Sequence, residues 1–278
     1  MNAARIELSR RQRLAWVWLL TIATLAAVAV LPPLAQPQEY HRFADQRTVL
    51  GIANFFDTVS SVAFLIVGAW GLIFVCRDRK SRPPAAFAGP AERRSFAVLF
   101  GAVALACFGS AYYHLAPDNE RLAWDRLPIA VSFASLFAAT IAERVSMRAG
   151  LRLLPALLAL GAGSVLYWRW TELYATENLW PYVAVQFYSA AAIVLIVVLF
   201  PSRYTRETDM LGAVGIYALA KIAESLDQEI YALGNIVGGH TLKHVIAAIA
   251  IYWILRMLQK RRPAVAAVSR PGEQTVRV

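Results

Sequence analysis

Blocks of about twenty apolar residues, separated by short charged loops, follow one another along most of this chain. A helix of about 20 residues crosses roughly 30 Å of hydrocarbon, so each block can form one membrane-spanning helix. Strands of a membrane barrel would instead be alternating segments of about ten residues. The sequence therefore predicts an all-α membrane protein, a seven-helix bundle preceded by one extra N-terminal transmembrane helix. The eight expected segments, of which the fifth and seventh are short or interrupted, are Leu14–Ala35, Gly51–Cys76, Ser95–Ala116, Asp125–Ile141, Leu153–Trp168, Pro181–Phe200, Leu211–Leu226 and Gly239–Leu258.

The composition excludes several classes of protein. Hydrophobic residues make up 58% of the 278 residues and charged residues 17%, whereas soluble domains have about 45–50% and about 25%. A soluble globular enzyme, a secreted disulfide scaffold and a disordered protein are therefore excluded. The two cysteines, Cys76 and Cys107, lie inside apolar blocks and match neither a disulfide framework nor zinc-finger spacing.

The net charge of +10 follows a topological pattern. Most of the 28 Lys and Arg residues lie in the two terminal segments and in alternate loops, at residues 77–94, 144–152 and 203–206. By the positive-inside rule this basic side is cytoplasmic, and an even number of spans places both termini there. The pattern favours a protein of a bacterial inner membrane over a nucleic-acid-binding protein. The opposite connections hold few basic residues, which are Arg42, Arg47, Arg121 and Arg126.

The chain divides into three expected parts. Residues 1–36 form a cytoplasmic tail and the extra helix, residues 37–260 form the seven-helix domain, and residues 261–278 form a basic cytoplasmic tail. Basic residues followed by an apolar run also resemble a signal peptide, so cleavage of the first segment is an open alternative. Either outcome leaves the other seven helices with the same orientation.

Chemically useful side chains gather at the outer ends of three helices. Ser110 and His114 are four residues apart near the end of the third helix, so they share a helical face. Asp125 opens the fourth helix, and His240 and His244 repeat the four-residue spacing at the start of the last one. Because the third helix runs outward and the fourth and eighth run inward, all five lie at a similar depth on one side.

Three histidines with a carboxylate and a hydroxyl are the parts of a metallo-hydrolase. Catalytic zinc typically has three protein ligands and an open position for water, whose pKa the metal lowers to about 7. A carboxylate such as Asp125 can accept the proton of that water, and a hydroxyl such as Ser110 can donate to the developing oxyanion.

Each residue alone has a plainer interpretation. A lone membrane histidine often forms a helix–helix hydrogen bond, Asp125 could cap its helix, and Ser110 could be a small packing residue. Ionisable groups inside a membrane are costly and usually functional, so all five together favour a site.

The five residues and their spacing resemble the alkaline ceramidases of the CREST superfamily, which also contains the progestin-and-adipoQ receptors. The resemblance extends over roughly Phe43 to Met257 and includes the segment Asn54–Ser61 at the first helix of the seven. It implies a seven-helix bundle that holds zinc and hydrolyses the amide of ceramide, or of a related N-acyl lipid, to an amine lipid and a fatty acid. By the same resemblance, the metal ligands would be His114, His240 and His244, Asp125 would hold the zinc water, and Ser110 would assist the oxyanion.

The chain departs from that family in two places. It has the extra first helix, and the acidic calcium-binding cluster of the eukaryotic members is reduced to Glu39 and Asp45, with Asn54 where a glutamate is expected. Calcium is therefore not expected, and the arrangement is closer to the bacterial branch. The acyl length, the head group and the oligomeric state are left open.

Other functions stay open at this stage. The main alternative is a receptor or sensor on the same scaffold, in which zinc is structural. A retinal protein with Lys221 or Lys243 as the Schiff-base lysine lacks an evident counter-ion pattern, and a transporter lacks paired broken helices.

The remaining embedded polar residues have open roles. Asp57, Ser60 and Ser61 form either a supporting network or a set of packing and capping groups. Lys221, Glu224 and Asp227 are spaced three residues apart on the seventh expected helix, where an internal ion pair is favoured over a substrate contact.

Overall fold

The computed structural model describes residues 8–77, 86–87, 89 and 91–264, which contain helices and no strands. The prediction of an all-α membrane bundle is thereby confirmed. In chain order the helices are α1 (Arg10–Val30), the 3-10 helix η1 (Gln38–His41), α2 (Phe55–Ser60), α3 (Val62–Cys76), α4 (Arg93–Leu115), α5 (Asn119–Arg144), α6 (Met147–Leu173), α7 (Trp180–Leu199), α8 (Asp209–Ser225), α9 (Asp227–Ala232) and α10 (Gly239–Lys260).

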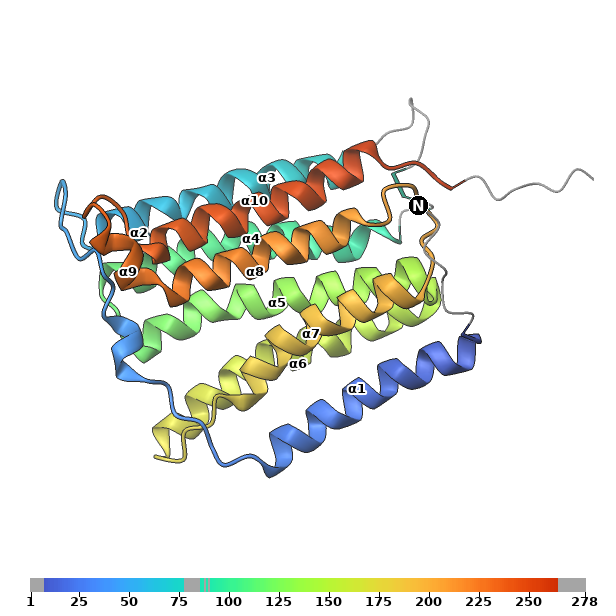
Figure 1. Ribbon diagram of the computed structural model, residues 1–278, viewed down its shortest axis with the longest axis horizontal. Helices are drawn as coiled ribbons and strands as arrows, with labels where there is room; N and C mark the ends of the chain where they lie inside the picture. Colours follow the sequence, from blue (N-terminus) through green and yellow to red (C-terminus); the bar gives the residue numbers. More distant parts are fainter. Residues whose placement is uncertain (1–7, 78–85, 88, 90, 265–278) are drawn as a thin grey trace, which may run out of the picture.

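Seven helices of the described chain are long and apolar enough to cross a membrane, with α2 and α3 together forming one of them. The seventh expected segment became α8, which has only 17 residues but packs against α10 within the bundle (Figure 1). Counting α8, the bundle after α1 has the seven helices that the sequence predicted.

Helix caps explain where the observed boundaries differ from the expected ones. The fifth segment is a 27-residue helix rather than a short one, because the Ser146 side chain accepts a hydrogen bond from Ala149 N and starts α6 early. Asp118 caps α5 in the same way, so Asp125 lies inside that helix and does not open it. Asp227 begins the separate helix α9, and its expected place on the same helix as Lys221 is wrong.

Six elements form a closed ring, in which α3, α4, α5, α7, α8 and α10 each pack against the next and α10 returns to α3. Helix α6 lies outside the ring against α5 and α7, and α1 packs on α7 at the edge of the bundle (Figure 1). The Thr21 hydroxyl of α1 lies 2.7 Å from the hydroxyl of Tyr188 on α7. The extra helix is therefore an addition to a ring that closes without it.

Two glycines allow the close helix contacts that bring the polar ends together. A Cβ on Gly109 would lie 2.2 Å from the Trp124 carbonyl oxygen, so α4 and α5 can approach this closely only with glycine there. A Cβ on Gly239 would lie 2.0 Å from the carbonyl oxygen of Ala223, at the contact between α10 and α8. These contacts hold the end of α4 against the start of α5, and the start of α10 against the end of α8.

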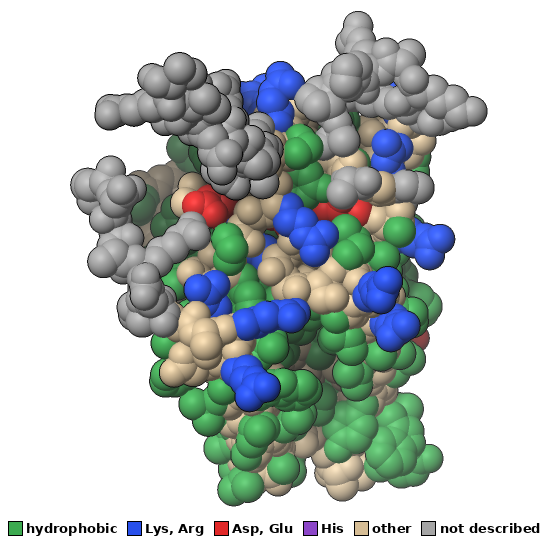
Figure 2. Space-filling model, turned by 90° about the vertical axis from the view of Figure 1, so that its right-hand side faces the viewer, with side chains coloured by type: hydrophobic (Ala, Val, Ile, Leu, Met, Phe, Trp, Pro, Cys, Tyr) green, Lys and Arg blue, Asp and Glu red, His purple; other side chains and the backbone are tan. Residues whose placement is uncertain are grey.

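The basic residues gather at one end of the bundle, as the charge pattern predicts. Figure 2 shows Lys and Arg side chains spread over the end where α1 begins and α10 finishes, above a largely hydrophobic wall. The helix ends that carry His114, Asp125 and His240 lie at the opposite end (Figure 1). The N-terminal residue Arg5, the loop residues Arg79, Lys80 and Arg82, and the tail residues Arg270 and Arg277 lie outside the described residues.

Candidate metal centre

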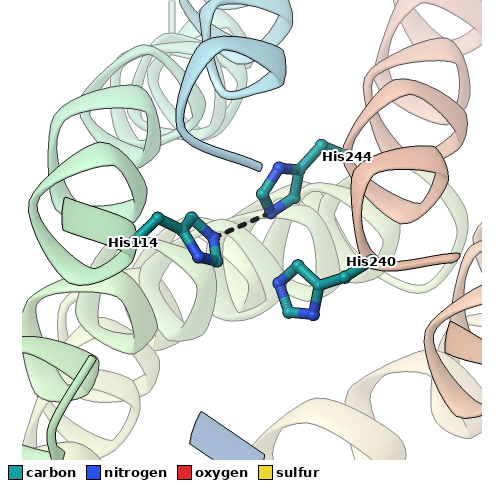
Figure 3. Close-up of side chains that lie close together, drawn as sticks. All are labelled: His114, His240 and His244. Carbon is teal, nitrogen blue, oxygen red and sulfur yellow. Dashed lines mark hydrogen bonds between the residues drawn. The ribbon is translucent and has the colours of Figure 1, made fainter. Parts of the chain in front are cut away.

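Three imidazoles converge at the end of the bundle opposite the basic face. His114 lies in the last turn of α4, and His240 and His244 lie in the first two turns of α10. All three are buried, and each offers one ring nitrogen within 4.8 Å of the others. Figure 3 shows the three rings turned toward a common point, with His114 Nε2 and His244 Nε2 joined at 3.4 Å.

This geometry fits a zinc ion. Two nitrogens that each lie about 2.0–2.1 Å from a tetrahedral zinc are roughly 3.3–3.4 Å apart, which matches the separation of the two Nε2 atoms. His114 would therefore bind the ion through Nε2, and its Nδ1 is the buried ring nitrogen left without a hydrogen-bond partner. Neutral imidazole nitrogens are zinc ligands of choice, so the donor set suits this metal.

The fourth histidine provides a comparison within the same molecule. His41 Nδ1 lies 2.9 Å from the Tyr113 hydroxyl, and His41 Nε2 lies 2.9 Å from Asn119 Oδ1. Both ring nitrogens of His41 therefore have ordinary partners. The other three histidines differ from His41 because one ring nitrogen of each faces the other two rings.

Neighbouring side chains fix the orientation of the cluster. The Ser60 hydroxyl lies 2.8 Å from His244 Nδ1, on the side of the ring away from Nε2. Asn54 Nδ2 donates to the His114 carbonyl oxygen at 2.7 Å, and Asp227 Oδ1 accepts from His240 N at 2.8 Å. The Ser60 contact sets which nitrogen of His244 is offered to a metal, and the other two contacts hold the backbone of His114 and of His240.

The segment of Asp57, Ser60 and Ser61 forms a supporting network rather than simple packing. Thr241 on α10 donates to Asp57 Oδ1 at 2.5 Å, and Ser61 donates to the Ser110 hydroxyl oxygen at 2.9 Å. Asp57 of α2 is thus bonded to α10, and Ser61, which follows α2 directly, is bonded to α4.

The structure brings Ser110 and Asp125 to the same place as the histidines. Ser110 Oγ lies 3.5 Å from His244 Nε2, and the Asp125 carboxyl lies close enough to the Ser110 hydroxyl to be stabilised by it. Both residues are buried. All five residues singled out in the sequence thus form one cluster, contributed by α4, α5 and α10.

A loop that the sequence patterns did not single out covers this cluster. The Phe43 ring lies 4.7 Å from the ring of His114 and 4.6 Å from that of His240, measured between centroids. Phe43 is buried, although none of the residues of η1 before it is. A loop lacks the periodicity that marks a helix face, so only its aromatic content could have hinted at this role.

An ion-pair cluster adjoins His240. Glu224 accepts from Lys221 and, at 3.0 Å, from Lys243, as the favoured internal ion pair predicts. Tyr40 also donates to Glu224, at 2.9 Å. Burial, together with the Glu224 carboxylate, raises the pKa of the Tyr40 hydroxyl well above its usual value, so it stays protonated. Lys243 Nζ lies 2.7 Å from His240 Nε2, which connects this cluster to the histidines.

A cavity of about 260 Å³ opens between the ring helices beside the cluster. Asp125, His244, Lys243 and Glu224 line its polar end. The cavity extends deep into the bundle. Leu136, which also lines it, comes eleven residues after Asp125 on α5 and therefore lies about 16 Å deeper along the helix axis. Apolar side chains from each helix of the ring line the rest, among them Phe64, Val103, Leu136, Ile193, Val214 and Ile254.

A family model matches most of this chain. The pattern of a family described as a family of unknown function (DUF6962) matches residues 59–263, which include all five residues of the cluster. No curated protein and no solved structure matched the chain.

Proposed function

Since this chain belongs to a family of unknown function (DUF6962), we propose its activity from its own site: it is a zinc-dependent intramembrane amidohydrolase. Its substrate is ceramide or a related N-acyl lipid, which it cleaves to a free amine lipid and a fatty acid. The observation that carries the proposal is the convergence of three buried imidazoles with Asp125 and Ser110 at the polar end of an apolar cavity.

The five residues divide the chemistry among them. His114, His240 and His244 would hold the zinc, which when bound would supply an activated water and polarise the amide carbonyl. Asp125 accepts the proton that the water loses and passes it to the amine nitrogen as the C–N bond breaks. Ser110 donates a hydrogen bond to the carbonyl oxygen while that oxygen carries negative charge. The oxygen of the water ends in the carboxylate of the fatty acid.

Asp125 and Ser110 favour catalysis over a purely structural metal. A structural zinc site is closed by protein ligands and needs neither a proton acceptor nor an oxyanion donor beside it. Here the Ser110 hydroxyl lies 3.5 Å from His244 Nε2 and near the Asp125 carboxyl. This contact favours the hydrolase over the receptor or sensor on the same scaffold.

The cavity supports a lipid substrate. Its wall is apolar from the middle of the bundle up to the cluster, which suits an acyl chain with the amide at the polar end. The ring helices also expose large apolar side chains on their outer faces, as contact with lipid requires. We propose that the substrate enters from the bilayer.

We place the protein in a bacterial inner membrane with both termini in the cytoplasm and the site toward the periplasm. The basic end of the bundle supports this orientation, because Lys and Arg are retained on the cytoplasmic side (Figure 2). The cluster lies at the other end.

A lipid-hydrolysis screen of the purified protein tests the proposal. Fatty acid release from ceramides and other N-acyl lipids would be read by mass spectrometry, with and without a zinc chelator. Asp125→Asn is the inactive variant, and Asp118→Asn, in the exposed cap of the same helix, is its matched control. A zinc-loaded protein that cleaves no N-acyl lipid would favour the receptor or sensor.

A further inference from the structure

Arg126 is a buried cation without a carboxylate partner. Its side chain is 5% exposed, and its Nη1 has no hydrogen-bond partner. Its Nη2 donates to Gln36 Oε1, which belongs to a neutral amide. Among the described residues no Asp or Glu lies within ion-pair distance of this guanidinium. Isolated buried charges are costly, so such a group needs another source of compensation.

Aromatic rings hold the Arg126 guanidinium in place. Its Cζ lies 4.5 Å from the ring centroid of Trp168, 4.9 Å from that of Tyr182 and 5.6 Å from that of Tyr40. Cation–π contacts of this kind stabilise the charge and fix its position, but they do not satisfy its N–H donors. These three rings therefore hold the guanidinium in place while its Nη1 still has no hydrogen-bond acceptor.

The guanidinium lines the same cavity as the metal cluster. The other cations of that wall, Lys221 and Lys243, are both paired with Glu224. The other acid of the wall, Asp125, forms no ion pair with Arg126, although the two charges attract each other at longer range. Among the described residues, Arg126 is thus the cation of this wall that forms no ion pair with a carboxylate.

Arg126 lies at the head-group end of the cavity. The Tyr40 ring, over which the guanidinium lies, is 6.5 Å from the ring of His240 between centroids. One aromatic ring therefore separates Arg126 from the cluster. The apolar wall that would hold the acyl chain, represented by Leu136, lies deeper along α5.

From this arrangement we infer that the substrate is an acidic N-acyl lipid, whose head group carries an anion within a few bonds of the amide. The inference rests on the proposed function and narrows its substrate class. A carboxylate or a phosphate can accept two hydrogen bonds from one guanidinium, so both share the chemistry that Arg126 recognises. N-acyl amino acids are the carboxylate form, and neutral ceramides lack the anion.

Binding of two matched ligands tests the inference without turnover. Both are ketone analogues of an N-oleoyl lipid in which a methylene replaces the amide nitrogen, so neither can be hydrolysed. One carries the carboxylate of an acylglycine, and the other carries the hydroxymethyl group of an acylethanolamine. We expect the zinc-loaded protein to bind the carboxylate about 10- to 100-fold more tightly, the range for a hydrogen bond to a charged group. A third analogue with a phosphate head group shows which anion fits better.

Two variants assign the preference to Arg126. Arg126→Gln removes the charge, and Gln36→Glu supplies a carboxylate to the same guanidinium with little change in volume. Both are expected to abolish the preference. Arg121→Gln, which alters a partly exposed arginine on the same helix, is the matched control and should keep it. Zinc content and thermal unfolding show that each variant is folded, and Gln36→Glu tests the point if Arg126→Gln does not fold.

The outcomes separate the two proposals. Equal binding of the charged and neutral analogues by the wild-type protein overturns the inference, as does a preference that survives in folded Arg126→Gln or Gln36→Glu. A clear preference that depends on Arg126 supports it even if hydrolysis assays detect no activity, and then only the proposed hydrolysis fails.

Discussion

The Ser60 hydroxyl lies 2.8 Å from Nδ1 of His244, across 184 positions of the chain. This contact leaves Nε2 of the same ring to face His114, at 3.4 Å. Ser60 therefore sets which nitrogen of His244 is offered to a metal, although it does not contact the metal position itself.

Replacing Ser60 with alanine should weaken metal binding. Loss of an outer partner of a metal-ligating histidine typically lowers metal affinity about 10- to 100-fold. Zinc affinity would be measured by competition with a chelating dye. Ser164→Ala is the matched control, because Ser164 is buried and donates only to Gly161 O of its own helix. Equal zinc affinity in the two variants would show that the Ser60 contact has no such role.

Removing two of the three histidines should empty the site. The wild-type protein is expected to carry about one zinc per chain, since three histidines and a water complete a tetrahedral set. The double variant His240→Ala/His244→Ala leaves one ligand and should retain no zinc by elemental analysis. His41→Ala, which alters the histidine outside the cluster, should keep the metal. Full occupancy in the double variant would refute the ligand assignment.

Asp125 and Ser110 should differ in how much they contribute to catalysis. Asp125→Asn removes the proton acceptor and should lower kcat about 100- to 10,000-fold while zinc stays bound. Ser110→Ala removes one oxyanion donor, a loss of about 100- to 1,000-fold where catalysis depends on it strongly, and less where zinc polarises the carbonyl. Asp125→Asn is therefore the more damaging change. Near-full hydrolysis by both zinc-loaded variants would make these residues structural.

Gly109 should be intolerant of a side chain. A Cβ there meets the Trp124 carbonyl oxygen, so Gly109→Ala must push α4 away from α5. We expect a loss of about 1–3 kcal/mol, as for other overpacked interiors, together with weaker zinc binding. Gly101→Ala on the same helix meets nothing within 4 Å and should be neutral or stabilising, by up to about 1 kcal/mol. Thermal unfolding in detergent compares the two, and equal melting temperatures would contradict the close contact.

Labelling from outside the cell tests the orientation. In a background without Cys76 and Cys107, a cysteine at Ala116 lies at the end of the bundle that carries the histidines, and one at Thr208 lies at the basic end; both positions are exposed. A membrane-impermeant maleimide applied to the periplasmic side should modify the first and not the second. The reverse pattern would place the site on the cytoplasmic side.

The sequence predicted the parts of the site that depend on helix periodicity. The four-residue spacing places His240 beside His244 and Ser110 beside His114 on whatever helix carries them. The alternation of basic loops then brought the ends of different helices to one side. These two rules sufficed to gather five residues from three helices.

Other features depend on tertiary contacts that no local pattern encodes. Phe43 lies in a loop, and Arg126 was counted only as a basic residue of the outer side, although its side chain is buried in an aromatic cage. Asp227 was predicted to lie on one helix with Lys221, but that helix ends before Leu226. The Asp227 carboxylate instead accepts a hydrogen bond from the backbone N–H of His240 at the start of α10. In each case the partner that decides the role lies far away in the sequence.

The rate of fatty acid release as a function of zinc occupancy tests the central claim most directly. Metal-free protein would be titrated with zinc while release from an N-acyl lipid is followed by mass spectrometry. The account predicts no release without zinc, a rise in proportion to bound zinc, and a maximum at about one zinc per chain. A rate that is independent of zinc occupancy, or no release at full occupancy from any N-acyl lipid, would contradict it.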